Sequence, residues 1–224
     1  MTREKKKAPP APRLRPRDKQ ATRRRLIEAV GVLLAREGFA GLGVNAVARE
    51  AGVDKVLIYR YFGGLPELLT VYGREGDFWP TVVELAGGDV AAALRRPLPD
   101  RVALLLKNFA RALRKRPVTL EIMAWEVLER NELTVLLEEV REKTAVELAE
   151  TFGSDLSADG SERSDLPAVV ALLASALMYL AVRAGRGTRK FNMVDLQSEE
   201  GWHRLDEAIE VLLRGWDVLV RDGQ

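Results

Sequence analysis

VNAVAREAGVDKVLIYRYF, residues 44–62, reads as two short helices joined at a tight turn around Gly52. The first helix has apolar residues at the spacing of one buried helical face: Val44, Val47 and Ala48. Gly52 suits the end of this helix, because a left-handed residue there costs glycine no Cβ strain. Asp54 can accept a hydrogen bond from a free N–H of the next helix, which runs to Phe62. Two helices joined so tightly cross steeply, so the pattern predicts a helix-turn-helix whose second helix can enter a DNA major groove.

The flanking sequence favours a compact three-helix unit over an isolated helical hairpin. Residues 21–37 form an amphipathic helix that ends at Gly38, and its apolar positions are Leu26, Ile27, Val30, Leu33 and Leu34. Gly63 and Gly64 interrupt the chain again before a fourth helix. The alternative is an ordinary hairpin with a solvated outer face, because short motifs also match by chance.

The order of these motifs resembles the N-terminal domain of TetR-family transcriptional regulators. The resemblance covers roughly residues 20–70 and rests on Gly38-Phe39, Ala51-Gly52-Val53, Ile58 to Phe62, and Glu67-Leu68-Leu69. It implies an all-α fold in which a three-helix DNA-binding domain precedes a larger helical domain for ligand binding and dimerisation. It also implies a homodimeric, sequence-specific repressor that binds an inverted-repeat operator on double-stranded DNA and is released by a small-molecule effector.

The charge distribution agrees with a DNA-binding N-terminal region. Residues 1–25 hold eleven Lys or Arg against two acids, a net charge of +9, so the other 199 residues carry about −7 of the total of +2. A cationic arm gains affinity for DNA by releasing condensed counterions. Prolines at four positions argue against regular structure at its start. We therefore expect a disordered basic arm at 1–17, a helix-turn-helix domain at 18–64, and an effector-binding and dimerisation domain at 65–224.

Candidate DNA contacts follow from which side chains the second helix would leave exposed. Ile58 and Phe62 are one turn apart and should pack inward. The resemblance places Tyr59 at a phosphate-contacting tyrosine. The chain departs from the family at Leu42-Gly43, which lacks a capping Ser or Thr, and at Gly63-Gly64, where backbone N–H groups replace a lysine. The predicted DNA-binding residues are Arg23, Arg24, Asn45, Lys55, Val56, Leu57, Tyr59, Arg60 and Gly64.

The remainder of the chain reads as helices without strand-like alternation. The expected ranges are 65–79, 89–95, 100–115, 118–129, 132–152, 167–184 and 202–220. Residues 166–182 carry no charge, which is just long enough for a membrane span, but burial in a helical bundle is favoured. Helices 167–184 and 202–220 are both apolar along a broad stripe, so we expect them to form a homodimer interface, since helix-turn-helix proteins usually bind two half-sites.

The sequence offers a less definite effector site, because large apolar side chains mostly serve as core. Glu126 is the charged residue expected to face inward, where it would suit a cationic or hydroxylated ligand. The candidate pocket residues are Phe78, Trp79, Phe109, Met123, Trp125, Glu126, Met178 and Tyr179.

Enzyme and metal sites find little support in the sequence. The chain has no cysteine and a single histidine, which excludes thiol catalysis, thiolate zinc sites and histidine-pair chemistry. We therefore expect no catalytic residues, no metal and no cofactor. DNA binding, and the lack of an apolar run after the basic arm that would mark an export signal, favour a cytoplasmic protein without a membrane partner. Two alternatives remain open: an architectural protein that binds DNA without sequence preference and has no effector, or a helical interaction module with an incidental basic tail.

Overall fold

The computed structural model describes residues 16–75, 77–128, 130, 132–153 and 166–222. The N-terminal elements are α1 (Pro16–Glu37), a 3-10 turn (Phe39–Gly41), α2 (Val44–Glu50), α3 (Val56–Phe62) and α4 (Leu65–Glu75). The elements that follow are α5 (Val82–Leu85), α6 (Val90–Leu94), α7 (Leu98–Arg114), α8 (Pro117–Glu126), α9 (Glu132–Phe152), α10 (Leu166–Gly185), β1 (Lys190–Phe191), β2 (Val194–Asp195) and α11 (Glu199–Asp222). Over these described residues the fold is all-α, as the sequence predicts, with one short hairpin added.

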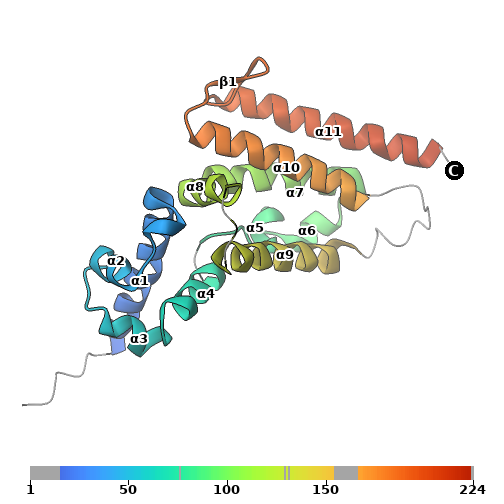
Figure 1. Ribbon diagram of the computed structural model, residues 1–224. Coiled ribbons are helices and arrows are strands. Elements are labelled where there is room, and N and C mark those ends of the chain that lie inside the picture. Colours follow the sequence, from blue (N-terminus) through green and yellow to red (C-terminus); the bar gives the residue numbers. More distant parts are fainter. Residues whose placement is uncertain (1–15, 76, 129, 131, 154–165, 223–224) are drawn as a thin grey trace, which may run out of the picture.

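The first three helices share one core, as expected from their apolar spacing. Leu26, Val30 and Leu33 of α1 are fully buried, and so are Val47 of α2 and Ile58 of α3. A helix as short as α2 or α3 is not stable alone, so packing against α1 holds both in place. Figure 1 shows this unit at one end of the molecule, with α4 leading from it towards α9.

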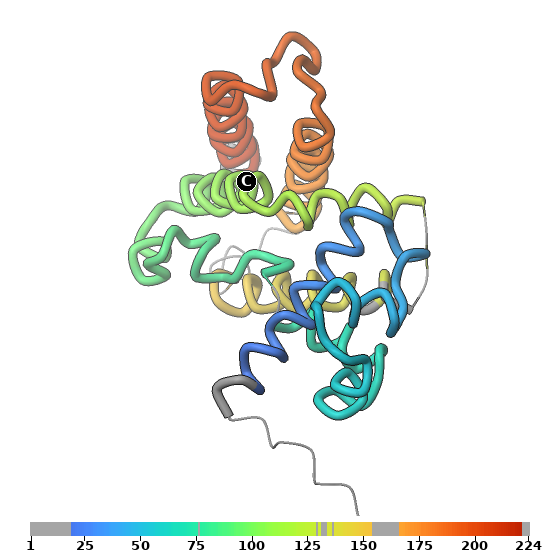
Figure 2. Tube along the Cα trace, turned by 90° about the vertical axis from the view of Figure 1, so that its left-hand side faces the viewer, coloured from blue at the N-terminus to red at the C-terminus, as the bar shows by residue number. Residues whose placement is uncertain are grey.

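The larger domain is layered around α7. Helices α10 and α11 both pack on α7, while α8 bridges α10 and α1. Figure 2 shows α10 and α11 side by side at the end of the molecule farthest from α2 and α3. Arg116, buried at the start of α8, donates to Asp77 (Nε to Oδ1, 2.9 Å) and to Glu84 (Nη2 to Oε2, 2.6 Å). This arginine therefore ties the segment after α4 to the body.

Several boundaries differ from the sequence-based expectations. Helix α1 begins at Pro16 instead of residue 21, because proline is favoured in a first helical turn, where its missing N–H would have had no partner. Residues 1–15 of the expected arm lie outside the described residues. Helix α4 ends at Glu75 instead of residue 79. The antiparallel hairpin β1–β2 was not expected, because strands of two residues are too short to show alternation.

Helix α10 differs most from its expected environment. Its inner face is buried on α7 and α8, but only 17% of its most apolar 18-residue window is buried within the chain. The expectation of a helix enclosed by its own bundle is therefore wrong for the isolated chain. By length and composition α10 is long and apolar enough to cross a membrane, although one such helix is weak evidence of a span.

Candidate DNA-binding surface and effector groove

The turn between α2 and α3 has the geometry that its sequence predicts. Gly52 takes the left-handed conformation (φ 63°), and the N–H of Val53 donates to the carbonyl of Ala48 at 3.0 Å. The carboxylate of Asp54 then accepts a hydrogen bond from the N–H of Val56 at 2.8 Å. Glycine relieves steric strain at the turn, and aspartate satisfies a free donor at the start of α3, so both residues fix how the two helices cross.

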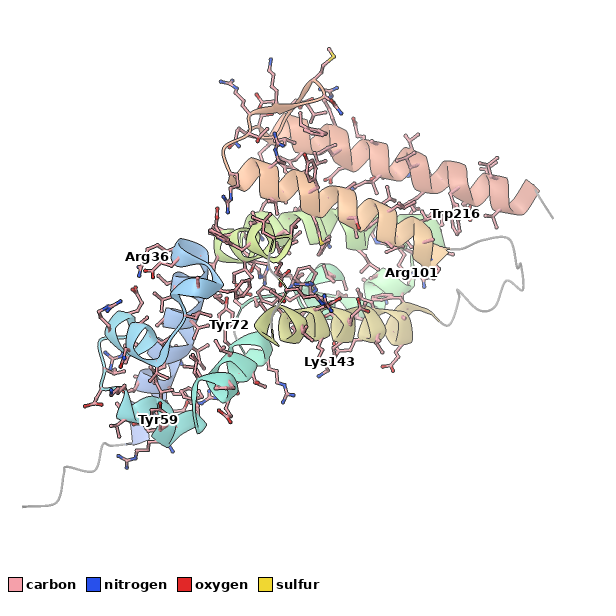
Figure 3. The ribbon with its side chains drawn as sticks, in the orientation of Figure 1. Arg36, Tyr59, Tyr72, Arg101, Lys143 and Trp216 are labelled. Atoms are coloured by element: carbon pink, nitrogen blue, oxygen red, sulfur yellow. The ribbon has the colours of Figure 1, made fainter. Side chains whose placement is uncertain are left out.

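Helix α3 presents a mixed apolar and cationic face to solvent. Val56 and Tyr59 are 60% and 55% exposed, although neither residue type favours so much contact with water. Lys55 and Arg60 are exposed with them, and Figure 3 shows Tyr59 at the outer end of the molecule. Leu57, by contrast, is half-buried and packs against the core of this domain. This packing does not support the predicted contact of Leu57 with the DNA major groove.

Of the polar side chains beside this face, some are exposed and others already form hydrogen bonds. Arg24 is exposed on α1, and Asn45 is exposed on α2. Arg23 donates two hydrogen bonds to Glu75 of α4, at 2.5 and 2.8 Å, and its guanidinium carbon lies 5.4 Å from the centre of the Phe62 ring. The bonds from Arg23 hold the pKa of Glu75 below its usual value. In this structure Arg23 joins α1 to α4 instead of pointing freely outward.

The two departures from the TetR-family pattern lie at the starts of α2 and α4. Gly43 precedes α2 in extended backbone and provides no side-chain cap, as the sequence predicts. Gly64 is buried at the start of α4, and a Cβ placed on it would lie 2.9 Å from a carboxylate oxygen of Glu67. A carboxylate so close opposes a phosphate, so the expected anion contact at Gly64 carries less weight than the contacts from α3.

A groove of about 880 Å³ lies where α4, the segment after it and α9 meet. Its size is in the range of small-molecule sites in proteins. It is lined by Gly73, Arg74, Glu75, Asp77, Trp79, Pro80, Thr81, Glu139, Val140, Lys143, Thr144 and Glu147. Of the described residues predicted for an effector pocket, Trp79 is the one that lines this groove. The groove is therefore more polar than expected, and it lies beside α4, which leads from the helix-turn-helix unit.

The structure brings some of the other predicted pocket residues together and separates the rest. The rings of Trp79 and Phe109 meet edge to face with centroids 5.4 Å apart. Met123 and Met178 belong to the same hydrophobic cluster of the body. Phe78 instead lies in the core shared with α1 and packs near Tyr72, with ring centroids 6.4 Å apart. The predicted set therefore spans two cores.

Two of the predicted aromatic residues lie away from these cores. Trp125 packs against the backbone at Gly38, where an added Cβ would come within 3.2 Å of the indole. Tyr179 is exposed on α10, where it contacts Phe191 of the hairpin and Arg183. Their placement does not support the pocket role expected for either residue.

Glu126 faces inward as expected, but it is not the only charged residue there. Arg141 of α9 donates from Nη1 to both carboxylate oxygens, at 2.9 and 2.8 Å, and its guanidinium carbon lies 5.8 Å from the Trp79 ring centre. Burial raises the pKa of Glu126, while the hydrogen bond from Arg141 opposes that rise. Sequence reasoning missed Arg141 and the groove residues of α9, because the polar stripe through Glu139, Lys143 and Glu147 is typical of a solvated helix face.

Glu126 gives a testable pH dependence. Because its pKa is raised in the folded state, its protonated form stabilises the fold fully below the ordinary glutamate pKa, and this contribution is lost as pH rises through the folded-state pKa. We expect the free energy of unfolding of the wild type, relative to that of Glu126→Gln, to increase as pH falls from 7.5 to about 4.3. Urea unfolding of both proteins at each pH measures the difference. A flat difference would show that Arg141 cancels the effect of burial, and a change in the opposite direction would show that Arg141 outweighs it.

The N-terminal part of the chain matches known proteins in sequence. The family model described as bacterial regulatory proteins, tetR family, matches residues 26–70. An HTH-type transcriptional repressor of Streptomyces coelicolor is 31% identical over 114 residues, which are 50% of this chain and 53% of the relative. The matched part of the chain thus spans about half the length of that curated relative.

Solved structures extend the likeness in fold to most of the chain. A TetR-family regulator from Rhodococcus sp., described as putative, superposes with a TM-score of 0.61 at 17% identity, covering 87% of this chain and 99% of that one. FadR from Bacillus subtilis, solved with stearoyl-CoA, gives 0.58 at 17% identity, covering 85% and 96%. The helix-turn-helix at residues 44–62 and the family match around it lead to one assignment: the chain carries the N-terminal domain of the TetR family of bacterial regulatory proteins, joined to a body that shares the fold of the solved structures.

Proposed function

We propose that the protein is a DNA-binding transcriptional repressor that reads an operator through the exposed face of α3. The observation that carries the proposal is that Val56 and Tyr59 lie exposed beside Lys55 and Arg60 on the second helix of the motif. Apolar side chains contact thymine methyl groups in the major groove, while Lys and Arg bind guanine or phosphate. Arg24 and Asn45 flank this face and complete the proposed contact surface.

The repressor acts as a homodimer through the outer faces of α10 and α11. Both helices pack on α7 by their inner faces, so their outer faces point to the same side. Exposed residues on α10 recur at helical spacing: Ala168, Ala171, Leu172, Ser175, Ala176 and Tyr179. A matching stripe on α11 is formed by Ala208, Val211, Leu212, Gly215, Val218 and Leu219. Two adjacent apolar stripes are what a second copy would cover in a four-helix interface, and a dimer matches an inverted-repeat operator.

A small molecule bound in the groove between α4 and α9 would act on DNA binding through α4. Trp79 lines the groove, and the centre of its ring lies 6.0 Å from that of Phe78. The centre of the Phe78 ring in turn lies 6.4 Å from that of Tyr72. Tyr72 in turn lies against Gly31 of α1, where an added Cβ would come within 3.0 Å of the hydroxyl. A ligand that displaces Trp79 would thus shift α1 and α4, and about 1–3 kcal/mol of coupling changes operator affinity roughly 5- to 150-fold.

Selection of genomic DNA fragments by the purified protein at near-physiological salt tests the proposal directly. Retained fragments should share an inverted repeat with half-sites about one helical turn apart. Retention without a shared motif would instead favour an architectural protein that binds DNA without sequence preference, which the charge of the N-terminal arm would also support. A complete lack of DNA binding would favour a helical interaction module.

The basic arm should contribute affinity without specificity. Residues 1–15 contain six Lys or Arg and one Glu, and deleting them leaves α1 whole. We expect the truncated protein to bind its operator more weakly, with the slope of log K against log salt reduced by roughly 0.9 for each phosphate that the arm would have neutralised. Fluorescence anisotropy over a range of salt concentrations measures both quantities. An unchanged slope would show that the arm does not touch the duplex.

The proposed function also implies that the protein is not an enzyme and that it acts in the cytoplasm. The TetR family consists of regulators and not enzymes, in agreement with the sequence-based expectation. A DNA-binding regulator of bacteria acts in the cytoplasm, where α10 would be covered by a partner subunit instead of lipid. A dimer in detergent-free buffer would support this location, whereas aggregation reversed by lipid would favour the membrane alternative.

A further inference from the structure

We propose that the effector groove adjoins a binding site for a cationic group, formed by the carboxylate of Glu126 and the ring of Trp79, and that Arg141 occupies this site in the absence of ligand. The effector would then be an organic cation with a guanidinium-like or ammonium group, which takes the place of Arg141. This inference rests on the proposed function only in identifying the bound cation with the effector.

The contacts of Arg141 define the chemistry of the site. Both oxygens of Glu126 accept hydrogen bonds from Nη1, and the same guanidinium lies within 6 Å of the Trp79 ring centre, at 5.8 Å. A carboxylate next to an aromatic ring is the combination that binds guanidinium and ammonium groups in proteins. Phe109 packs against the edge of Trp79, so the orientation of the indole is set independently of Arg141.

The two partners of the pair are unequally buried. The side chain of Glu126 is 12% exposed, whereas that of Arg141 is 22% exposed and belongs to a different helix. A long arginine side chain can move to solvent by rotating, but the shorter carboxylate stays among its neighbours. Burial raises the pKa of Glu126 even with Arg141 in place, so its charge is incompletely compensated. The carboxylate is therefore the fixed part of the site and the arginine the exchangeable part.

The neighbouring groove has the size and the mixed polar and apolar lining to hold the rest of such a ligand. Trp79, Val140 and Thr144 form part of its wall. Four carboxylates line it against two cations: Glu75, Asp77, Glu139 and Glu147 against Arg74 and Lys143. Two of these carboxylates are already paired, Glu75 with Arg23 and Asp77 with Arg116, so the groove carries little net charge and suits the uncharged part of such a ligand.

Benzamidine and benzamide test the site, because the two have nearly the same shape and only benzamidine is charged. Calorimetric titration would compare the wild type with Arg141→Met, which removes the resident cation and keeps an apolar stem. We expect Arg141→Met to bind benzamidine roughly tenfold more tightly than the wild type, and to bind it more tightly than benzamide. The double variant Glu126→Gln/Arg141→Met should lose this preference for the cation.

Arg186→Met is the matched control, because Arg186 forms a part-exposed ion pair with Glu121 of α8 (2.7 Å) and neither residue lines the groove. It should bind benzamidine as the wild type does. Equal affinity of Arg141→Met and wild type, or equal affinity for benzamidine and benzamide, would show that the pair only fastens α9 to α8. Should Arg141→Met fail to fold, the wild type carries the test: benzamidine must raise its Tm more than benzamide does, and Glu126→Gln must abolish the difference.

Failure of this site is distinguishable from failure of the proposed function. Selection of DNA fragments uses no ligand, so recovery of an operator by a protein that does not discriminate benzamidine from benzamide rejects the cation site alone. Recovery of no operator, with cation binding intact, rejects the repressor and leaves a ligand-binding protein of another kind.

Discussion

Replacing both Leu172 and Leu219 by arginine is expected to convert the protein to a monomer and to weaken operator binding by about 100- to 10,000-fold. The two leucines are 73% and 75% exposed on the outer faces of α10 and α11, so neither substitution should disturb the core of a single chain. In a symmetric interface each new arginine would be buried near its own copy, which costs several kcal/mol. A monomer then loses the gain in affinity from binding two half-sites at once.

Sedimentation velocity and DNA titration of the same samples measure these effects. Leu128→Arg is the matched control, because Leu128 is 77% exposed but lies after α8, away from both stripes. This control should remain dimeric and keep its operator affinity. A double variant that stays dimeric would place the interface elsewhere, and a monomeric variant with full affinity would show that dimerisation is not needed for DNA binding.

Val56→Glu is expected to have the next largest effect, a loss of operator affinity of roughly 30-fold or more. Val56 lies at the start of α3 with most of its side chain in solvent, so its replacement should leave the core intact. A carboxylate there would face DNA bases and phosphates, and one unfavourable contact costs about 1–3 kcal/mol, incurred twice in a dimer. Circular dichroism and thermal melting should be unchanged, so the loss would be assigned to the interface.

Val83→Glu provides the matched control for that substitution. Val83 is exposed to a similar degree, but it lies on α5 in the body. Its replacement adds the same charge to the protein and should leave anisotropy titrations with operator DNA nearly unchanged. Equal losses for the two variants would show that net charge, and not the face of α3, governs binding.

The sequence by itself determined the helix-turn-helix, including its turn, the start of its second helix and the face that is buried. Gly52, Asp54 and the apolar spacing around Ile58 act locally, because a left-handed turn, a capped helix start and a buried stripe each depend on residues close in sequence. The structure confirms all three. Local rules also placed most helices of the body to within a few residues, since their boundaries coincide with proline, glycine or polar segments.

Only the tertiary structure decided which apolar surfaces are core and which are open. The sequence shows one broad stripe on residues 202–220, but packing on α7 buries Ile209 and Leu213 and leaves Leu212 and Leu219 exposed. In the same way Trp79 reaches the groove while Trp125 covers Gly38, although both are large aromatic residues in apolar surroundings. The pairing of Glu126 with Arg141 joins two helices whose relative placement depends on the whole body. Helical periodicity gives the face on which a side chain lies, but its partner depends on how distant helices cross, and the sequence pattern does not encode that crossing.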